Sequence, residues 1–269
     1  MYWLFLRRKI LIVSLVMLVL LLAVSLYFFL WSTLKPPKDK SLPPAASSPL
    51  QEKRILIDVG HGGIDGGASK GDALLEKDIN LEMALQLQKV LQNQGAIALL
   101  SRDLDRDLSG VDPNDRRRNT LDLTNRIRWA NQVGGDIFLS LHMNSSQSSR
   151  VRGALLLYYK HVKEDSETER LAQHLQRELN YFYSSYAHKG EIYKHNPMKG
   201  NYFVLKHTKM PAVIVEMGFI TNNEDRKVFQ NEEFQQAFCE ALVKGLIKYF
   251  SQVPDKYIPS ERPGMNEGL

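Results

Sequence analysis

Short apolar runs and helically spaced apolar residues alternate along the middle of the chain. Runs typical of buried strands cover 55–59, 96–100, 137–141, 153–159, 202–205 and 212–215. Between them, apolar residues recur at helical spacing over 78–93, 120–132, 164–182 and 232–250. Strands that alternate with helices predict an α/β fold. We expect a single-domain sandwich with a mostly parallel or mixed central sheet flanked by helices.

A long apolar segment precedes this region. Residues 10–31 are almost wholly apolar, interrupted only by Ser14 and Ser25, and about 20 such residues span a bilayer. Arg7, Arg8 and Lys9 come directly before it, as in a signal or anchor segment. We therefore expect residues 1–34 to be an uncleaved transmembrane helix that exports the remainder of the chain. Cleavage near Ser25, with secretion of the rest, is the alternative.

The remaining boundaries come from composition. Residues 35–53 contain five prolines among Ala and Ser, which predicts a linker. The globular domain is expected over 54–250, with Gly95 ending its first helix and Asn231 as the N-cap of its last. Residues 251–269 are polar and are expected to form a loose tail.

The net charge of +5 does not indicate nucleic-acid binding. Residues 1–50 contain six Lys or Arg and one Asp, so the remainder is balanced, with 29 basic and 29 acidic residues. Cys239 is the single cysteine, which excludes an intramolecular disulfide, and its place in the last helix pattern predicts a buried small side chain.

Candidate chemistry gathers at predicted strand ends, where α/β sheets build their sites. His61 follows the strand 55–59, His142 follows 137–141, and Glu216 follows 212–215. Two imidazoles and a carboxylate can hold Zn²⁺ with one position open, and a further carboxylate can move protons. These residues point to a zinc hydrolase.

Two neighbouring features are less specific by themselves. The glycine-rich stretch 58–67 lacks the spacing of a nucleotide-binding loop, and its glycines instead let the backbone turn tightly around His61. Glu76 stands just before a predicted helix, where a carboxylate favours the helix dipole. From its own context, Glu76 is a helix-start residue and not a ligand.

Six motifs, in order, resemble the zinc-dependent N-acetylmuramoyl-L-alanine amidases of bacterial cell walls (amidase type 3), over about 54–250. They are Asp58-Val-Gly-His61-Gly-Gly, Glu76-Lys-Asp-Ile-Asn80, Ser101-Arg-Asp103, Asn125-Arg126 with Ala130-Asn131, Ser140-Leu-His142-Met-Asn144, and Pro211-Ala-Val-Ile-Val-Glu216-Met-Gly-Phe219.

The resemblance implies specific roles. His61, Glu76 and His142 would bind one Zn²⁺ per chain, and Glu216 would be the catalytic carboxylate that moves the proton. The substrate would be the amide between N-acetylmuramic acid and L-alanine in peptidoglycan.

Four residues near these motifs have less specific expectations. Asp58 is expected either to orient His61 or to pack at the strand end. Asn144 is expected either to contact substrate or to shape the turn after His142. Arg102 and Arg126 are expected to be structural ion-pair partners.

Within the family, the chain looks like the germination-specific amidases of endospore formers, because of its anchored layout, the basic stretch around Arg116-Arg117-Arg118, and residues 201–208. Those enzymes prepare the spore cortex for muramic δ-lactam formation, usually with a partner deacetylase. The alternatives are a vegetative amidase for wall turnover or cell separation, a zinc peptidase acting within the stem peptide, and a catalytically silent, membrane-tethered wall-binding module. We expect membrane anchoring with the catalytic domain outside the cytoplasm, peptidoglycan as partner, and a polysaccharide deacetylase or an activating protein as a further partner.

Overall fold

The computed structural model describes residues 3, 17, 20, 24–25, 48–69, 74–160, 166–186, 191 and 193–252. The chain divides into two compact units, Met1–Leu42 and Pro43–Leu269. Five residues of the first unit are described, and all are helical and exposed. Within the described part of the chain, no helix is both long and apolar enough to cross a bilayer. The transmembrane helix expected over 1–34 otherwise lies outside the described residues, as does the expected tail beyond 252.

The second unit contains a mixed six-stranded sheet. Its strands are β1 (Arg54–Val59), β2 (Ile97–Leu100), β3 (Ile137–Asn144), β4 (Leu155–Tyr158), β5 (Met198–Lys199) and β6 (Ala212–Phe219). They lie in the order β2-β1-β3-β6-β4-β5. All neighbours are parallel except β4, which runs antiparallel to β6. The predicted α/β class and mixed sheet are confirmed.

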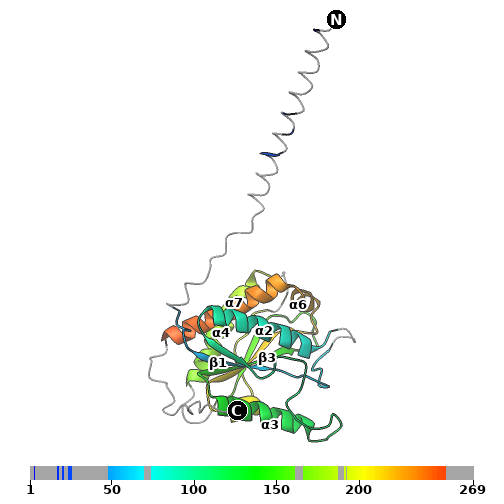
Figure 1. Cartoon of the computed structure of the whole chain (residues 1–269), viewed down its shortest axis with the longest axis vertical. Coiled ribbons are helices and arrows are strands. Elements are labelled where there is room, and N and C mark those ends of the chain that lie inside the picture. Colours follow the sequence, from blue (N-terminus) through cyan, green and yellow to red (C-terminus); the bar gives the residue numbers. More distant parts are fainter. Residues whose placement is uncertain are drawn as a thin grey trace. The chain divides into compact units, whose positions relative to one another are not determined.

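Helices cover both faces of this sheet (Figure 1). One layer contains α2 (Glu76–Asn93), α4 (Ser166–Ser184) and α7 (Glu232–Gln252). The opposite side carries α3 (Arg118–Val133) and α5 (Phe203–His207), and α6 (Asn223–Val228) follows β6. Because both faces are covered, the central strands are buried on both sides and consist mostly of consecutive apolar residues.

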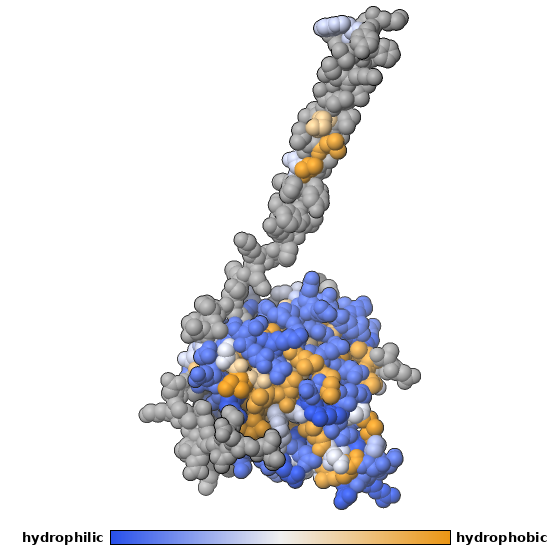
Figure 2. Space-filling model, in the orientation of Figure 1, coloured by the Kyte–Doolittle hydropathy of each residue, from blue (hydrophilic) through white to orange (hydrophobic). Residues whose placement is uncertain are grey.

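A hydrophobic cluster joins α3 and α5 to the sheet. Leu56, Phe138 and Ile214 are nearly fully buried in it, and Ile127 and Leu205 reach it from the helices. In the view of Figure 1, hydrophilic residues predominate where the helices of the upper part of the domain face solvent (Figure 2). This pattern of apolar inner and polar outer faces is the one that the helical spacing in the sequence predicts.

The predicted helix ends agree with local hydrogen bonding. Asn231 Oδ1 accepts a hydrogen bond from Phe234 N at 2.9 Å, which confirms Asn231 as the N-cap of α7. Gly95 follows α2 with a φ of 78°, and its N–H donates to Gln92 O at 2.9 Å. A glycine adopts this left-handed conformation at a helix end without a steric penalty.

Two sequence predictions were wrong. Residues 202–205 do not form a strand, because Phe203–His207 is helix α5. Lys206 N donates to Tyr202 O at 2.9 Å, which is the hydrogen bond of a helical turn. The linker predicted over 35–53 also ends earlier, since Leu50 is 0% exposed and Glu52 N donates to Gly95 O at 2.9 Å. The packed domain therefore already includes Ser48 and Leu50, before the first strand.

Candidate active site

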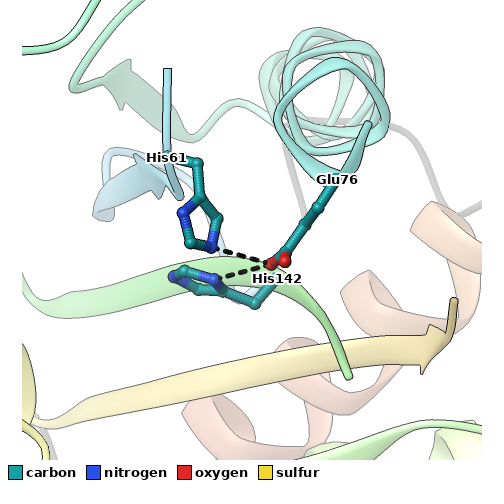
Figure 3. Close-up of side chains that lie close together, drawn as sticks. All are labelled: His61, Glu76 and His142. Carbon is teal, nitrogen blue, oxygen red and sulfur yellow. Dashed lines mark hydrogen bonds and ion pairs between the residues drawn. The ribbon is translucent and has the colours of Figure 1, made fainter. Parts of the chain in front are cut away.

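His61, Glu76 and His142 meet at one edge of the sheet. His61 Nε2 lies 3.1 Å from Glu76 Oε1, and His142 Nδ1 lies 2.9 Å from the same oxygen. Both imidazole rings point toward the carboxylate (Figure 3), and their centroids are 4.9 Å apart at an interplanar angle of 81°. The structure thus brings together two residues that the strand pattern singled out and one that it did not.

The parallel strands account for this convergence. β1 ends at Val59, two residues before His61, and it pairs with β3, which carries His142. His142 is in turn the register partner of Glu216 on β6. Both residues lie inside their strands and not just past them, because β3 and β6 continue to Asn144 and Phe219. Gly60 permits this arrangement, since a Cβ there would lie 2.4 Å from His142 Cε1.

The backbone of His61 is held in an unusual conformation. Its φ is 60°, in the left-handed region that non-glycine residues rarely adopt. Arg102 Nε and Arg126 Nη2 both donate to the His61 carbonyl, at 2.9 and 2.7 Å. Strain of this kind persists where surrounding contacts fix it, and it concentrates at functional sites. The two guanidinium groups therefore hold His61 in its position at the site.

Asp65 orients the His61 ring. Its Oδ2 lies 3.0 Å from His61 Nδ1, which leaves Nε2 directed at Glu76. Burial lowers the pKa of His61, but hydrogen bonds to Asp65 and Glu76 outweigh it and raise that pKa to about 9. The hydrogen bond to His61 in turn lowers the pKa of Asp65 to about 2. The sequence interpretation gave Asp65 no role, although its position four residues after His61 in a glycine-rich loop was a usable signal.

Glu76 is buried and fully engaged. It is the first residue of α2 and is 3% exposed. Ala68 N donates to its Oε2 at 2.8 Å, and Met143 N donates to its Oε1 at 3.0 Å. Burial raises the pKa of the Glu76 carboxyl, but hydrogen bonds from His142 and His61 bring it well below its usual range. A carboxylate held this way faces the imidazoles as an anion and is not a solvent-facing helix-start residue.

Glu216 differs from Glu76 in its surroundings. Its Oε2 is buried and has no hydrogen-bond partner among the described residues. Burial raises the pKa of Glu216 to about 7; the neighbouring His142 acts against the shift, and Glu76 adds to it. A buried carboxyl with a free oxygen and a pKa near neutrality is suited to accept and release a proton.

Asp58 does not contact His61, which corrects the prediction that it orients that ring. Its carboxylate accepts hydrogen bonds from Ser101 Oγ, Ser140 Oγ and Arg126 Nη1, at 3.0, 2.8 and 2.8 Å. Among the described residues, Arg126 is the link between Asp58 and His61. The position of Asp58 agrees with the alternative prediction, in which it packs at the strand end. Burial raises the pKa of Asp58, but the charge of Arg126 and the hydrogen bonds outweigh this effect, so the pKa lies below its usual value.

The two arginines differ in kind. Arg126 pairs with Asp58 and Asp122, at 2.8 and 2.7 Å, which confirms it as a structural ion-pair partner. For Arg102 the predicted ion pair was wrong, since its guanidinium has no ion-pair partner among the described residues. It donates to backbone carbonyls, including those of Gly60 and Lys77, and so links the glycine-rich loop to α2.

A cavity of about 300 Å³ opens over the site. His61, His142 and Glu216 line it, together with residues from α3 and from the start of α5. Asn144 is not one of the described residues that line it. Its Oδ1 accepts from Ser145 N at 2.7 Å, and its carbonyl accepts from Ile220 N at 2.8 Å, so it shapes the turn after β3. A contact between Asn144 and substrate stays a prediction.

The site fits a metal ion that prefers nitrogen and oxygen ligands. One ligand atom from each of His61, Glu76 and His142 lies within 4.8 Å of the others. Two imidazole nitrogens and one carboxylate are a donor set that catalytic zinc sites use, with a further position left for water or substrate. The hydrogen bond from His61 to Asp65 is the outer support that such ligands usually have.

Comparison with known proteins identifies the family. Residues 55–248 match the family model described as N-acetylmuramoyl-L-alanine amidase. The chain belongs to the N-acetylmuramoyl-L-alanine amidase family. It is 32% identical over 210 residues to the germination-specific N-acetylmuramoyl-L-alanine amidase of Bacillus subtilis, covering 78% of this chain and 84% of that protein. The probable cell wall amidase LytH of Staphylococcus epidermidis is 33% identical over 224 residues, or 82% of this chain and 66% of that one.

A solved amidase structure agrees with the fold. The CwlD amidase of Clostridioides difficile, in complex with the GerS lipoprotein, superimposes with a TM-score of 0.64 at 30% identity, covering 74% of this chain and 99% of that one. The chain is therefore an amidase that acts on peptidoglycan, and the resemblance to spore cortex amidases is supported.

Proposed function

We propose that this amidase hydrolyses the N-acetylmuramoyl–L-alanine amide with one Zn²⁺ held by His61, Glu76 and His142. The observation that carries the proposal is the convergence of His61 Nε2 and His142 Nδ1 on one Glu76 oxygen, with Glu216 as the register partner of His142. When bound, Zn²⁺ polarises the scissile carbonyl and makes water more acidic.

Glu216 moves the proton in this mechanism. Its Oε2, which no described residue hydrogen-bonds, accepts a proton from the attacking water and delivers it to the nitrogen of the leaving amine. The water oxygen bonds to the carbonyl carbon as the carbon–nitrogen bond breaks. The products are the lactyl carboxylate of muramic acid and the free amine of L-alanine.

The biological setting we propose is modification of spore cortex, leading to muramic δ-lactam and germination. The B. subtilis relative named as germination-specific supports it. We further propose a polysaccharide deacetylase acting in sequence with this enzyme. The complex of the CwlD amidase with a lipoprotein supports an activating protein partner as well. A vegetative wall role is the second candidate, because relatives named as probable cell wall amidases are equally similar.

We also propose that the protein is anchored in a membrane with its catalytic domain outside the cytoplasm. The apolar residues 10–31 and the preceding Arg7-Arg8-Lys9 support this location. Secretion after cleavage is the alternative. Separating membrane from soluble fractions of cells, and sequencing the N-terminus of the recovered protein, tests both.

Mass spectrometry of digests tests the reaction itself. The full chain, loaded with Zn²⁺, is incubated with cortex and with vegetative peptidoglycan. Release of intact stem peptides with a free L-alanine amine is expected. Cuts within the glycan or within the peptide would contradict the amidase assignment. Activity on vegetative peptidoglycan without activity on cortex would favour the vegetative role.

Glu216→Gln separates proton transfer from metal binding. Because the amide cannot accept the water proton, turnover is expected to fall by about 10²–10⁴-fold. Zinc content, measured on the same protein, is expected to stay at one ion per chain. Loss of zinc from this variant would mean that Glu216 is a ligand and that the roles proposed here are wrong.

A further inference from the structure

One wall of the cavity exposes aromatic side chains to solvent. Tyr202 and Phe203 are 44% and 41% exposed, and they line the same cavity as His61, His142 and Glu216. Large apolar side chains at the rim of a polar site are typical of ligand contacts, since they leave water when a ligand covers them. The proposed amidase mechanism uses neither residue.

The fold keeps Tyr202 and Phe203 outside the core. Val204 and Leu205, the next two residues, are 6% and 2% exposed and belong to the cluster under α3 and α5. Thr208 Oγ1 donates to Val204 O, which closes the short helix. Since the following residues anchor α5 in the core, Tyr202 and Phe203 stay on its outer side.

The Tyr202 ring also packs against a glycine. A Cβ added at Gly200 would lie 2.2 Å from Tyr202 Cε2 and 2.5 Å from its Cδ2, so the ring packs directly against the bare glycine. Gly200 is itself fixed, because its N–H donates to Tyr158 O at 2.8 Å. This contact restricts the ring before any ligand arrives, which reduces the entropy lost on binding.

The charges around the cavity indicate what this wall binds. Asp58, Asp65, Asp122 and Glu216 line the cavity, and Arg126, the one guanidinium or ammonium group among its described lining residues, already pairs with Asp58 and Asp122. The described lining residues therefore offer no unpaired guanidinium or ammonium group to a carboxylate of the stem peptide. A pyranose ring is neutral and presents a face of C–H groups, which suits an aromatic surface.

We propose that Tyr202 is the platform on which the pyranose ring of the substrate's muramic acid stacks, so that its lactyl amide reaches the site. This inference rests on the proposed function, because it names the subsite for the sugar part of that substrate. Tyr202 is a positioning residue that takes no part in proton transfer.

Two ligands that differ only in the sugar test it. They are N-acetylmuramoyl-L-alanyl-D-isoglutamine and the same dipeptide with a lactoyl group in place of the muramoyl unit. Binding is measured by calorimetry on the zinc-loaded full chain carrying Glu216→Gln, which prevents turnover. In that background, Tyr202→Ala is expected to weaken the muramoyl ligand about tenfold and to leave the lactoyl ligand unchanged within about twofold.

Further variants isolate the ring. Tyr202→Phe keeps the aromatic face and is expected to bind both ligands as the parent does. Gly200→Ala displaces the ring without touching the ligand and is expected to resemble Tyr202→Ala. Lys206→Ala, on the exposed side of α5, is the control and is expected to change neither affinity. Zinc content of each variant shows that the metal site is intact.

Three outcomes would overturn the proposal: equal weakening of both ligands, weakening of neither, or no advantage of the muramoyl ligand in the parent protein. Turnover of the muramoyl ligand by the chain with Glu216 intact is scored separately. Release of free L-alanyl-D-isoglutamine shows that the proposed amidase function stands even where the sugar subsite fails.

Discussion

Asp58 and Asp65 belong to the same glycine-rich stretch, yet their surroundings give them different roles. Asp65 hydrogen-bonds the ring of His61, whereas Asp58 is buried among two serines and Arg126. Residue type is identical in the two cases. The partner that each carboxylate faces decides whether it supports a metal ligand or the backbone that carries it.

Asp65→Asn tests the support of His61. The amide is a weaker acceptor for the Nδ1 proton, so the ring loses its fixed tautomer and its basicity. Affinity for Zn²⁺ is expected to fall about 10–100-fold, measured by competition with a chelator. Asp103→Asn is the matched control, since the Asp103 side chain is 66% exposed and pairs only with Arg106 among the described residues. Equal zinc affinity in both variants would show that Asp65 does not support the metal site.

At the scale of elements, the site depends on a tie between β1 and α3. Arg126 on α3 is 1% exposed and bonds Asp58 on β1, as well as the carbonyls of Val59 and His61. One buried side chain thus joins a strand end, a helix and the loop that holds a proposed ligand. Breaking it leaves a buried charge without a partner.

Arg126→Met is expected to destabilise the protein by about 3–5 kcal/mol, because Asp58 then stays buried without its guanidinium. Urea unfolding followed by circular dichroism measures the change. Arg128→Met is the control two residues along α3, where the side chain is exposed, and its effect is expected to be within about 0.5 kcal/mol. A similar stability for the two variants would contradict the structural role of the tie.

The buried ion pair between Asp58 and Arg126 also predicts that the stability of the protein depends on pH. The pKa of Asp58 in the folded protein lies below its usual value of 3.8, so the unfolded chain binds the proton more readily. The stability that this group contributes is complete above about pH 4 and is lost as the pH falls through the folded pKa. Asp58→Asn is expected to reduce the slope of unfolding free energy against pH below pH 4. An unchanged slope would show that Asp58 does not cause it.

At the scale of the whole molecule, the packed domain begins before its first strand. Leu50 is 0% exposed, and Lys53 O accepts a hydrogen bond from Ile97 N at 2.8 Å, so residues 48–53 pack against the domain. The last residues of the segment that proline content predicts to be a linker therefore contribute to the core.

Two truncations test this boundary. A chain that starts at Ser48 retains Leu50, whereas a chain that starts at Arg54 lacks it. We expect the shorter chain to be less stable by about 2–5 kcal/mol, the usual cost of removing a buried leucine side chain. The urea concentration at the unfolding midpoint is measured for both proteins. Equal midpoints would place the domain boundary at Arg54.

The sequence anticipated much of the fold because most elements have one consistent period. Helices α2, α3, α4 and α7 were predicted within a few residues of their ends. Residues 202–205 failed because four residues are too few to distinguish a strand from a helical turn. The extension of β3 past Leu141 was missed because His142 and Asn144 are polar, and strand pairing, not hydrophobicity, keeps them in the sheet.

By itself, the sequence determined the α/β class, the four long helices and the identity of His61, His142 and Glu216 as candidates, because local periodicity and polar residues directly after apolar runs are enough to show them. Only the tertiary structure brought Glu76 between the two imidazoles, gave His61 its partner Asp65, assigned Asp58 to Arg126 and left one oxygen of Glu216 without a hydrogen bond from the described residues. Apart from the hydrogen bond between His61 and Asp65, which lie four residues apart, those facts depend on contacts between segments far apart in the chain, and local patterns carry no information about such contacts.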